Sequence, residues 1–275
     1  MQIAVASGKG GTGKTTVSTS LALCGGADVQ FLDCDVEEPN GHIFLKPGLS
    51  GSTIHSVTIP RIDSDHCSYC GKCRNICRFN AITMFGQTIM CFGELCHSCL
   101  GCFLVCENEA IVRDSRDIGV LEWGRAGELD FVHGRLRVGE AMAVPLIRQV
   151  KKRARPDAMV IIDAPPGTSC PFVESVAGVD YVVLVTEPTP FGLHDLKLTV
   201  QALRSFAKPC GVVLNRADLG DGRLEEWCCR QNIPVLLKIP FDRAIAEGYA
   251  HGQTLVESRP DLRRPLENLL QEIRQ

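Results

Sequence analysis

Gly8-Lys9-Gly10-Gly11-Thr12-Gly13-Lys14-Thr15-Thr16 is the stretch that decides the fold of this chain. It matches the complete pattern G-x-x-x-x-G-K-[ST], in which backbone N–H groups surround a phosphate and the lysine neutralises it. An apolar run at residues 3–6 predicts a buried strand before the loop, and residues 15–25 predict a helix after it. A glycine-rich turn without function is the alternative, but it leaves the flanking strand and helix unexplained. We therefore predict a phosphate-binding loop, with the Thr15 hydroxyl bound to Mg²⁺.

A second candidate for the nucleotide site is the aspartate that ends the apolar run at residues 159–163. The run ends in Asp163 and continues into Ala164-Pro165-Pro166-Gly167. Because parallel sheets bind ligands at the carboxyl ends of their strands, Asp163 is expected near the phosphate loop. We predict that Asp163 holds Mg²⁺ through water opposite Thr15, and that the stiff turn changes position when the γ-phosphate leaves.

Asp35 is the candidate to orient or deprotonate the attacking water. It follows a predicted strand at residues 29–33, in the same half of the chain as the phosphate loop. The alternative is that Asp33 and Asp35 only cap a loop.

The remaining strands and helices alternate as in an α/β protein. Residues 118–138 suggest one or two short strands, and 139–154 a helix. Further strands are predicted at 181–186, 211–216 and 234–239, with helices at 191–206 and near 262–273. Asn215 ends one of these strands and carries the donor and acceptor that suit an adenine edge. The loop beginning at Pro240 is placed to cover the base. The fold class expected is α/β, a mostly parallel P-loop NTPase sheet flanked by helices.

Residues 59–117 differ in composition and predict a small inserted α+β domain, so that 1–58 and 118–275 form one discontinuous domain. Eight of the fifteen cysteines lie in this insert, in two runs with the same spacing. The first run is Cys67, Cys70, Cys73 and Cys77, and the second is Cys96, Cys99, Cys102 and Cys106. Each run is followed at the same offset by an Ala-Ile pair, which indicates an internal duplication.

This spacing predicts two [4Fe–4S] clusters. Three cysteines at offsets of three can surround one cluster, while the fourth points to the neighbouring cluster. The predicted ligand sets are Cys67, Cys70, Cys73 and Cys106 for one cluster, and Cys96, Cys99, Cys102 and Cys77 for the other. Structural zinc is the competing interpretation, although zinc sites usually pair two C-x-x-C elements. The segment resembles a bacterial-type two-cluster ferredoxin, but Arg78 and Glu107 stand where that family usually has proline.

Composition excludes several other classes of partner. The net charge is −3 with both signs scattered along the chain, so neither nucleic acid nor a lipid surface is an expected partner. The N-terminus runs directly into a strand, and apolar runs are too short to span a membrane, which predicts a cytoplasmic protein. Cytoplasmic thiols stay reduced, so the cysteines point to metal or redox chemistry.

The nucleotide-binding part resembles the MinD/Mrp branch of the deviant Walker A ATPases. The resemblance rests on the loop at residues 9–16, Asp35, the Asp163–Gly167 turn and Asn215, and it covers residues 1–55 and 118–275. The chain is similar in particular to MinD-superfamily ATPases of anaerobes that carry an inserted ferredoxin, some of which are linked to the orange-protein complex. The resemblance implies ATP and Mg²⁺ as ligands, Asp35 in a first switch, Asp163 and Gly167 in a second, and Asn215 in base recognition.

The same resemblance implies an ATP-dependent dimer, with itself or with a related ATPase. Lys9 would reach the phosphates bound by the partner subunit, where a second cation stabilises the phosphoryl-transfer transition state. Attraction of phosphate within its own subunit is the alternative for Lys9. Cys170 lies where related proteins can ligate a shared cluster, and an ordinary thiol is the alternative. The adjacent Cys228 and Cys229 do not form a C-x-x-C.

Two functions remain open on the sequence alone. The first is ATP-gated electron transfer to a redox partner, and the second is assembly or delivery of an Fe–S or other metal cofactor to an accepting protein. A MinD-like positioning ATPase ranks below both, because the C-terminal helix lacks a basic face for a membrane.

Overall fold

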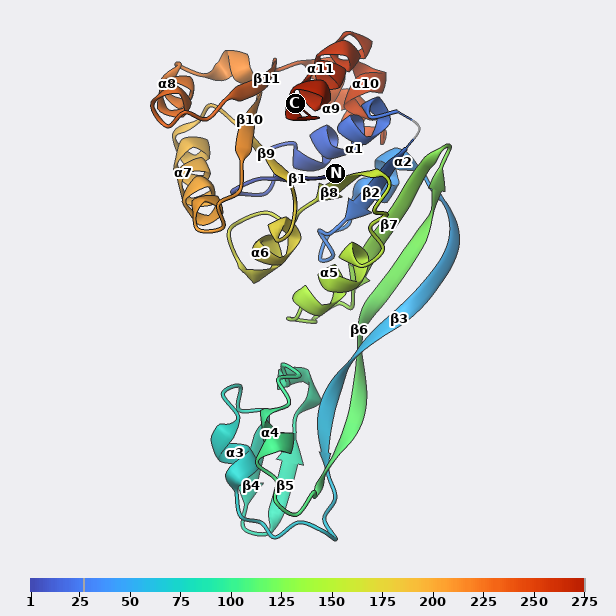
Figure 1. Ribbon diagram of the computed structural model, residues 1–275, viewed down its shortest axis with the longest axis vertical. Coiled ribbons are helices and arrows are strands. Elements are labelled where there is room, and N and C mark those ends of the chain that lie inside the picture. Colours follow the sequence, from blue (N-terminus) through green and yellow to red (C-terminus); the bar gives the residue numbers. More distant parts are fainter. Residues whose placement is uncertain (27, 275) are drawn as a thin grey trace.

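A nine-stranded sheet forms the centre of the larger unit of the molecule (Figure 1). Its strand order is β11-β10-β9-β1-β8-β2-β7-β6-β3, and all pairs from β11 to β7 are parallel. The structure is a computed structural model and describes residues 1–26 and 28–274. The strands are β1 (Gln2–Ala6), β2 (Val29–Asp33), β3 (Gly48–Ile62), β6 (Ile111–Ala126), β7 (Leu129–Leu136), β8 (Met159–Asp163), β9 (Tyr181–Thr186), β10 (Cys210–Asn215) and β11 (Val235–Ile239).

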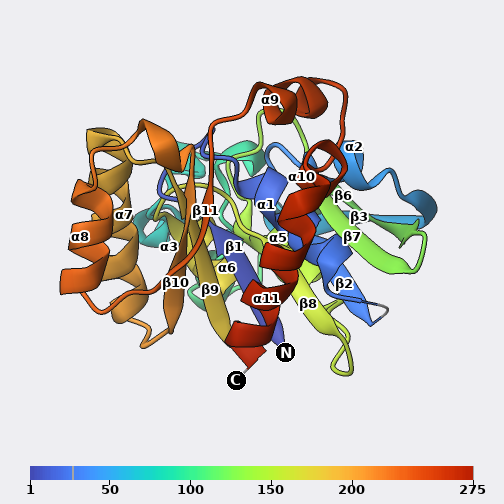
Figure 2. The same cartoon turned by 90° about the horizontal axis from the view of Figure 1, so that it is seen from above.

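Helices cover both faces of this sheet, as Figure 2 shows from above. The longer helices are α1 (Lys14–Cys24), α5 (Val144–Lys151), α7 (Pro190–Arg204), α8 (Arg223–Arg230), α9 (Arg243–Ala250) and α11 (Arg263–Arg274). The shorter ones are α2 (Gly41–Leu45), α6 (Cys170–Val176) and α10 (Leu255–Ser258). No helix within the described residues is both long enough and apolar enough to span a bilayer.

Two separate cores hold the helices on the sheet. One face packs α5, α6, α7 and α8 through side chains such as Leu146, Phe172 and Leu203. The other face packs α1, α10 and α11 through side chains such as Leu21 and Leu266. The central strands contribute to both cores, because alternate residues of a strand point to opposite faces. Burial on both faces explains why these strands are continuous apolar runs that the sequence identifies directly.

Strand β3 and the full length of strand β6 differ from what the sequence predicts. Strand β3 was not predicted, whereas the strands expected at 118–138 are confirmed as β6 and β7, an antiparallel hairpin in which β6 begins earlier, at Ile111. The helix predicted at 139–154 is confirmed only over the eight residues of α5. Most β3 residues are partly or fully exposed, so the strand has little hydrophobic periodicity, and its pairing with β6 joins residues far apart in sequence.

The far half of the β3–β6 pair carries a small unit, residues 63–110, with its own two-stranded sheet and core. This sheet pairs β4 (Ile82–Phe85) with β5 (Thr88–Cys91), beside the short helices α3 (Lys72–Ile76) and α4 (Gly101–Leu104). Figure 1 shows the unit at the end of this two-stranded arm. The expected domain limits at 59 and 117 fall inside β3 and β6, which run through them without interruption. The division into two domains stays a prediction.

Candidate functional site

The predicted phosphate loop lies between the end of β1 and the start of α1. Gly13 adopts a left-handed backbone conformation, with φ of +90°, immediately before the helix. A Cβ atom there would lie 2.5 Å from the Asn215 amide nitrogen, so a larger residue would have a strained backbone and would also displace the Asn215 side chain. The loop therefore presents its backbone at a helix N-terminus, a favourable position for an anion.

Lys14 lies among the carboxylates predicted to act with it. Its ammonium group donates to Asp163 at 2.8 Å and to Asp35 at 3.3 Å. The Thr15 hydroxyl donates to the other Asp163 oxygen at 2.7 Å. Burial acts to lower the pKa of Lys14, but attraction by these carboxylates outweighs burial and raises it. Asp163 and Asp35 thus pair with Lys14 in this structure, and a bound phosphate would have to replace them.

Asp33 and Asp35 have different surroundings. Asp33 is fully buried and accepts hydrogen bonds from the backbone N–H groups of Asp35 and Gly41, at 3.1 and 2.9 Å. Asp33 therefore does cap the loop, whereas Asp35 points to Lys14. Burial raises the pKa of Asp35 to about 6, and the nearby Asp163 adds to the effect while Lys14 opposes it.

This pKa leads to a first prediction, on the pH dependence of ATP hydrolysis. As the predicted base for the attacking water, Asp35 must be deprotonated to act, so kcat/KM should fall by about tenfold per pH unit below about pH 6 and level off above it. Asp35→Asn should lower kcat by about 10²–10⁴-fold and remove this inflection, which steady-state kinetics between pH 5 and 8 would measure. An unchanged inflection in Asp35→Asn would assign the pKa to another group.

A cavity of about 430 Å³ opens beside the loop, within the range of small-ligand sites. The predicted residues Asn215 and Pro240 line it, together with the aromatic rings of Phe241 and Tyr249. The Asn215 amide donates to the Thr12 carbonyl at 2.9 Å, while the buried Thr12 hydroxyl has no hydrogen-bond partner among the residues that the structure describes. Groups that can bind phosphate and aromatic rings that can contact a base line the same cavity, and this combination fits a nucleotide. Residues of the loop and its surroundings that line the cavity are Gly10, Gly11, Gly13, Lys14, Thr15, Thr16 and Asp35.

Lys9 lies outside this cluster of carboxylates. Its ammonium is 3.9 Å from Glu187, and its side chain is about one third exposed. Glu187 is nearly buried and also pairs with Arg216 at 2.8 Å. Neither Glu187 nor Arg216 was predicted from the sequence, although each directly follows the end of a strand at the same edge of the sheet as Asp163. Lys9 is thus held by Glu187 in this conformation and is accessible to a second molecule.

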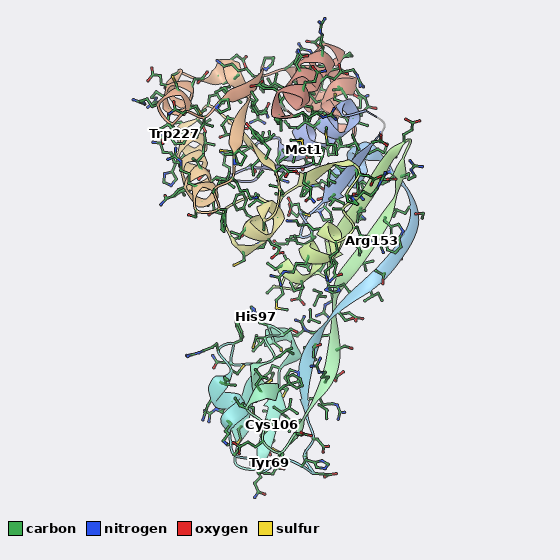
Figure 3. The ribbon with its side chains drawn as sticks, viewed as in Figure 1. Met1, Tyr69, His97, Cys106, Arg153 and Trp227 are labelled. Atoms are coloured by element: carbon green, nitrogen blue, oxygen red, sulfur yellow. The ribbon has the colours of Figure 1, made fainter. Side chains whose placement is uncertain are left out.

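The two cysteine runs fold alike and interlock. One cavity is lined by Cys67, Cys70, Cys73 and Cys106. A second cavity is lined by Cys77, Cys96, Cys99 and Cys102. Each set takes three cysteines from one run and the last cysteine from the other. In Figure 3, Tyr69 and Cys106 lie farther from the larger unit than His97 does. We therefore call the first set the distal site and the second the proximal site.

The residues around these sites fit a cluster held by thiolates. All fifteen cysteines are free thiols. Backbone N–H groups of Tyr69 and Ser98 donate to Cys67 and Cys96 sulfur at 3.4 Å, in equivalent positions of the two runs. Among residues 1–26 and 28–274, no three His, Cys, Asp or Glu side chains converge on a single metal ion. A [4Fe–4S] cluster does not need three protein ligands on one metal ion, because each of its four irons is bound by one cysteine.

Comparison with known proteins identifies the nucleotide-binding part. Residues 3–256 match the model of the CobQ/CobB/MinD/ParA nucleotide binding domain. Two uncharacterised proteins of Methanocaldococcus jannaschii are 29% and 30% identical, with 98% and 100% of this chain and 96% and 97% of those proteins aligned. An iron-sulfur cluster carrier protein of Aquifex aeolicus is 25% identical over 94% of this chain and 62% of its own length.

Solved structures show the same fold at low identity. The septum site-determining protein MinD of Pyrococcus horikoshii, complexed with Mg-ADP, matches with a TM-score of 0.61 and 19% identity, over 99% of this chain and 95% of that one. The cell division ATPase MinD of Pyrococcus furiosus matches with a TM-score of 0.59 and 19% identity, over 99% and 98%. The predicted α/β fold with a mostly parallel sheet between helices is therefore confirmed.

Proposed function

This chain belongs to the CobQ/CobB/MinD/ParA family of nucleotide-binding domains and is a P-loop ATPase, and on that premise we propose that its ATP cycle is coupled to two [4Fe–4S] clusters. The function that we propose is ATP-gated electron transfer to a partner protein. ATP and water become ADP and phosphate, while one electron leaves a reduced low-potential donor and reduces the acceptor. When bound, each cluster would supply a one-electron carrier at low potential.

The nucleotide half of the proposal assigns a role to each residue around Lys14. Binding of ATP would draw Lys14 away from Asp163 and Asp35 and onto phosphate. Thr15 and Asp163, joined by a hydrogen bond of 2.7 Å, would hold Mg²⁺ between them. Asp35, released from Lys14, would orient the attacking water and accept its proton. The Asp163–Gly167 turn would report the presence of the γ-phosphate, and Asn215 would recognise the base.

The cluster half rests on one observation. The cysteines that the spacing assigned to each ligand set line one cavity each, and each set crosses from one run to the other. Cysteines that came together only through packing would not be expected to form two sets of four, each with its fourth cysteine from the other run. Anaerobic purification and iron counting test this half. About eight irons per chain support it, whereas zinc in place of iron would refute it.

Lys9 supplies the second prediction. Lys9→Ala should keep nucleotide affinity in the monomer, lose ATP-dependent association, and lower turnover by about 10³-fold, as removal of a catalytic cation in trans does elsewhere. Analytical ultracentrifugation with and without Mg-ATP would measure the association. Lys238→Ala is the matched control, because Lys238 is an exposed lysine paired with Glu225 instead of Glu187. Association of Lys9→Ala at the wild-type concentration would rule out the role in trans.

Delivery of a cluster or other metal cofactor is the second candidate function. It is favoured by the names of relatives, an iron-sulfur cluster carrier protein and a cytosolic Fe-S cluster assembly factor of Caenorhabditis elegans that is 22% identical over 94% of this chain and 75% of its own length. The fate of the clusters during ATP turnover distinguishes the two functions. Clusters that stay bound through ATP turnover in the presence of a chelator support electron transfer, whereas transfer of iron to an apo-acceptor supports delivery.

A further inference from the structure

Four charged side chains join the proximal site to the larger unit. Arg116, in β6, pairs with Glu140 and with Glu94, the latter at 3.4 Å. Arg137 pairs with the same Glu94 at 2.7 Å. Arg116 also donates to the carbonyl oxygen of Cys96, a proximal-site cysteine, at 3.5 Å. We call Glu94, Arg116, Arg137 and Glu140 the bridge.

The bridge is fixed at its centre and anchored at both ends. The side chains of Arg116 and Glu140 are 7% and 1% exposed, so each charge depends on the other for compensation. Glu94 lies in the short 3₁₀ helix Gly93–Leu95, immediately before Cys96. Arg137 lies just after β7, and Glu140 accepts a hydrogen bond of 2.9 Å from the Met142 N–H at the approach to α5. A shift of α5 therefore reaches Cys96 through only two side chains.

Helix α5 is in turn tied to the helix that follows the Asp163–Gly167 turn. Lys151, at the end of α5, donates to the carbonyl oxygens of Glu174 and Ser175 at the end of α6, at 2.7 and 3.0 Å. Arg148 pairs with Glu174 at 2.9 Å. At the other end of the path, the Gly167 N–H donates to the Ser7 carbonyl beside the phosphate loop, at 2.9 Å. Packed and hydrogen-bonded elements thus run without interruption from the phosphate loop to Cys96.

The distal site lacks such a link among the described residues. The ion pairs beside it, Lys72 with Glu107 and His66 with Asp63, each join two residues of the small unit. The β3–β6 arm reaches both sites, so it cannot by itself distinguish them. The bridge distinguishes them, because it ends at Cys96.

We propose that the bridge transmits the nucleotide state of the ATPase unit to the proximal cluster site and leaves the distal site unaffected. This inference rests on the proposed function. Arg116 and Arg137 act as positioning residues, since they hold the loop of Cys96 against the larger unit and touch no reacting atom. A movement of the Asp163–Gly167 turn would displace α6, α5 and Glu140 as packed elements, and the buried Arg116 would follow Glu140.

Amide hydrogen exchange on the full, iron-loaded chain tests the bridge. Mg-ATP should change the exchange rate of residues 92–100 by about fivefold or more, the lower end of typical allosteric coupling, and leave residues 66–72 unchanged. Arg116→Gln should abolish this response, because it breaks both the pair with Glu140 and the hydrogen bond to the Cys96 carbonyl oxygen. Glu94→Gln and Arg137→Gln each remove part of the bridge and should weaken the response. Arg137→Lys should restore part of it. Glu107→Gln, which removes another exposed glutamate, beside the distal site, should respond as wild type does.

Two results would overturn the inference. A response of wild-type size in Arg116→Gln, or in the double variant Glu94→Gln with Arg137→Gln if Arg116→Gln does not fold, would show that the signal travels by another route. Equal responses at both sites, or none in the wild-type chain, would show that the bridge does not select the proximal site. ATP hydrolysis and iron content measured on the same samples report separately on the proposed function, so the two failures are distinguishable.

Discussion

Lys14→Ala is expected to lower ATP turnover by about 10²–10³-fold or more, while leaving the visible absorption of the clusters intact. The loss follows because Lys14 is the cation at the centre of the phosphate site, 2.8 Å from Asp163 and 3.3 Å from Asp35. The absorption survives because the cysteine sites lie in a separate unit with a separate core. Phosphate release and an ultraviolet-visible spectrum on one anaerobic sample measure both.

The same change also tests the buried charges. Without Lys14, Asp163 would be a fully buried carboxylate whose one remaining hydrogen bond, among the described residues, comes from Thr15. Breaking a buried pair in this way costs about 3–5 kcal/mol of folding free energy, and denaturant unfolding would show it. If Lys14→Ala unfolds, Lys14→Gln keeps an amide donor for Asp163 and tests the same loss of turnover. Wild-type turnover in both variants, or loss of cluster absorption in a variant that remains folded, would contradict the account.

Paired cysteine substitutions are expected to remove one cluster or both, depending on which cysteines are paired. In Cys67→Ala with Cys106→Ala, both changes fall in the distal set, so iron should fall from about eight to about four per chain. In Cys67→Ala with Cys77→Ala, one change falls in each set, so both clusters should be lost. Iron analysis and EPR spectroscopy measure the outcome.

The two double variants are matched, since each removes one cysteine at the start of a run and one at the end of a run. If each run held its own cluster, the results would be exchanged: the pair within the first run would lose one cluster and the pair across runs would lose both. That exchange would reject the ligand sets. ATP turnover serves as the control for folding of the larger unit, and it should persist in the absence of a partner protein.

The parts of the fold that the sequence predicted are those with a strong local pattern. Strands β1, β2 and β8 are buried on both faces and therefore appear as uninterrupted apolar runs. The phosphate loop carries its own motif, and the fold around it is confirmed. The arm is different, because β3 is largely exposed and is stabilised by pairing with β6, whose residues lie more than sixty positions away at Ser56 and Asp117. Nothing in the local sequence specifies such a pairing.

The site shows the same division. A motif or a position at a strand end was enough to predict the phosphate loop, Asp163, Asp35 and Asn215. The structure brings these residues together around one cavity or beside it. Glu187, Arg216 and the bridge could not be found in this way, because their partners come from distant segments. Arg116 and Glu140 look like ordinary surface charges in the sequence, and only the fold reveals that they are buried and paired. The roles assigned to these residues stay predictions.

An EPR-monitored redox titration of anaerobically purified protein, with and without Mg-ATP, tests the coupling of nucleotide to clusters most directly. The account predicts two [4Fe–4S] signals and a shift of one midpoint potential by about 59 mV or more, a tenfold change in the one-electron equilibrium. Lys14→Ala should show the two signals without the shift. Titration curves that coincide with and without Mg-ATP in the wild-type chain would contradict the claim that hydrolysis and the clusters are coupled.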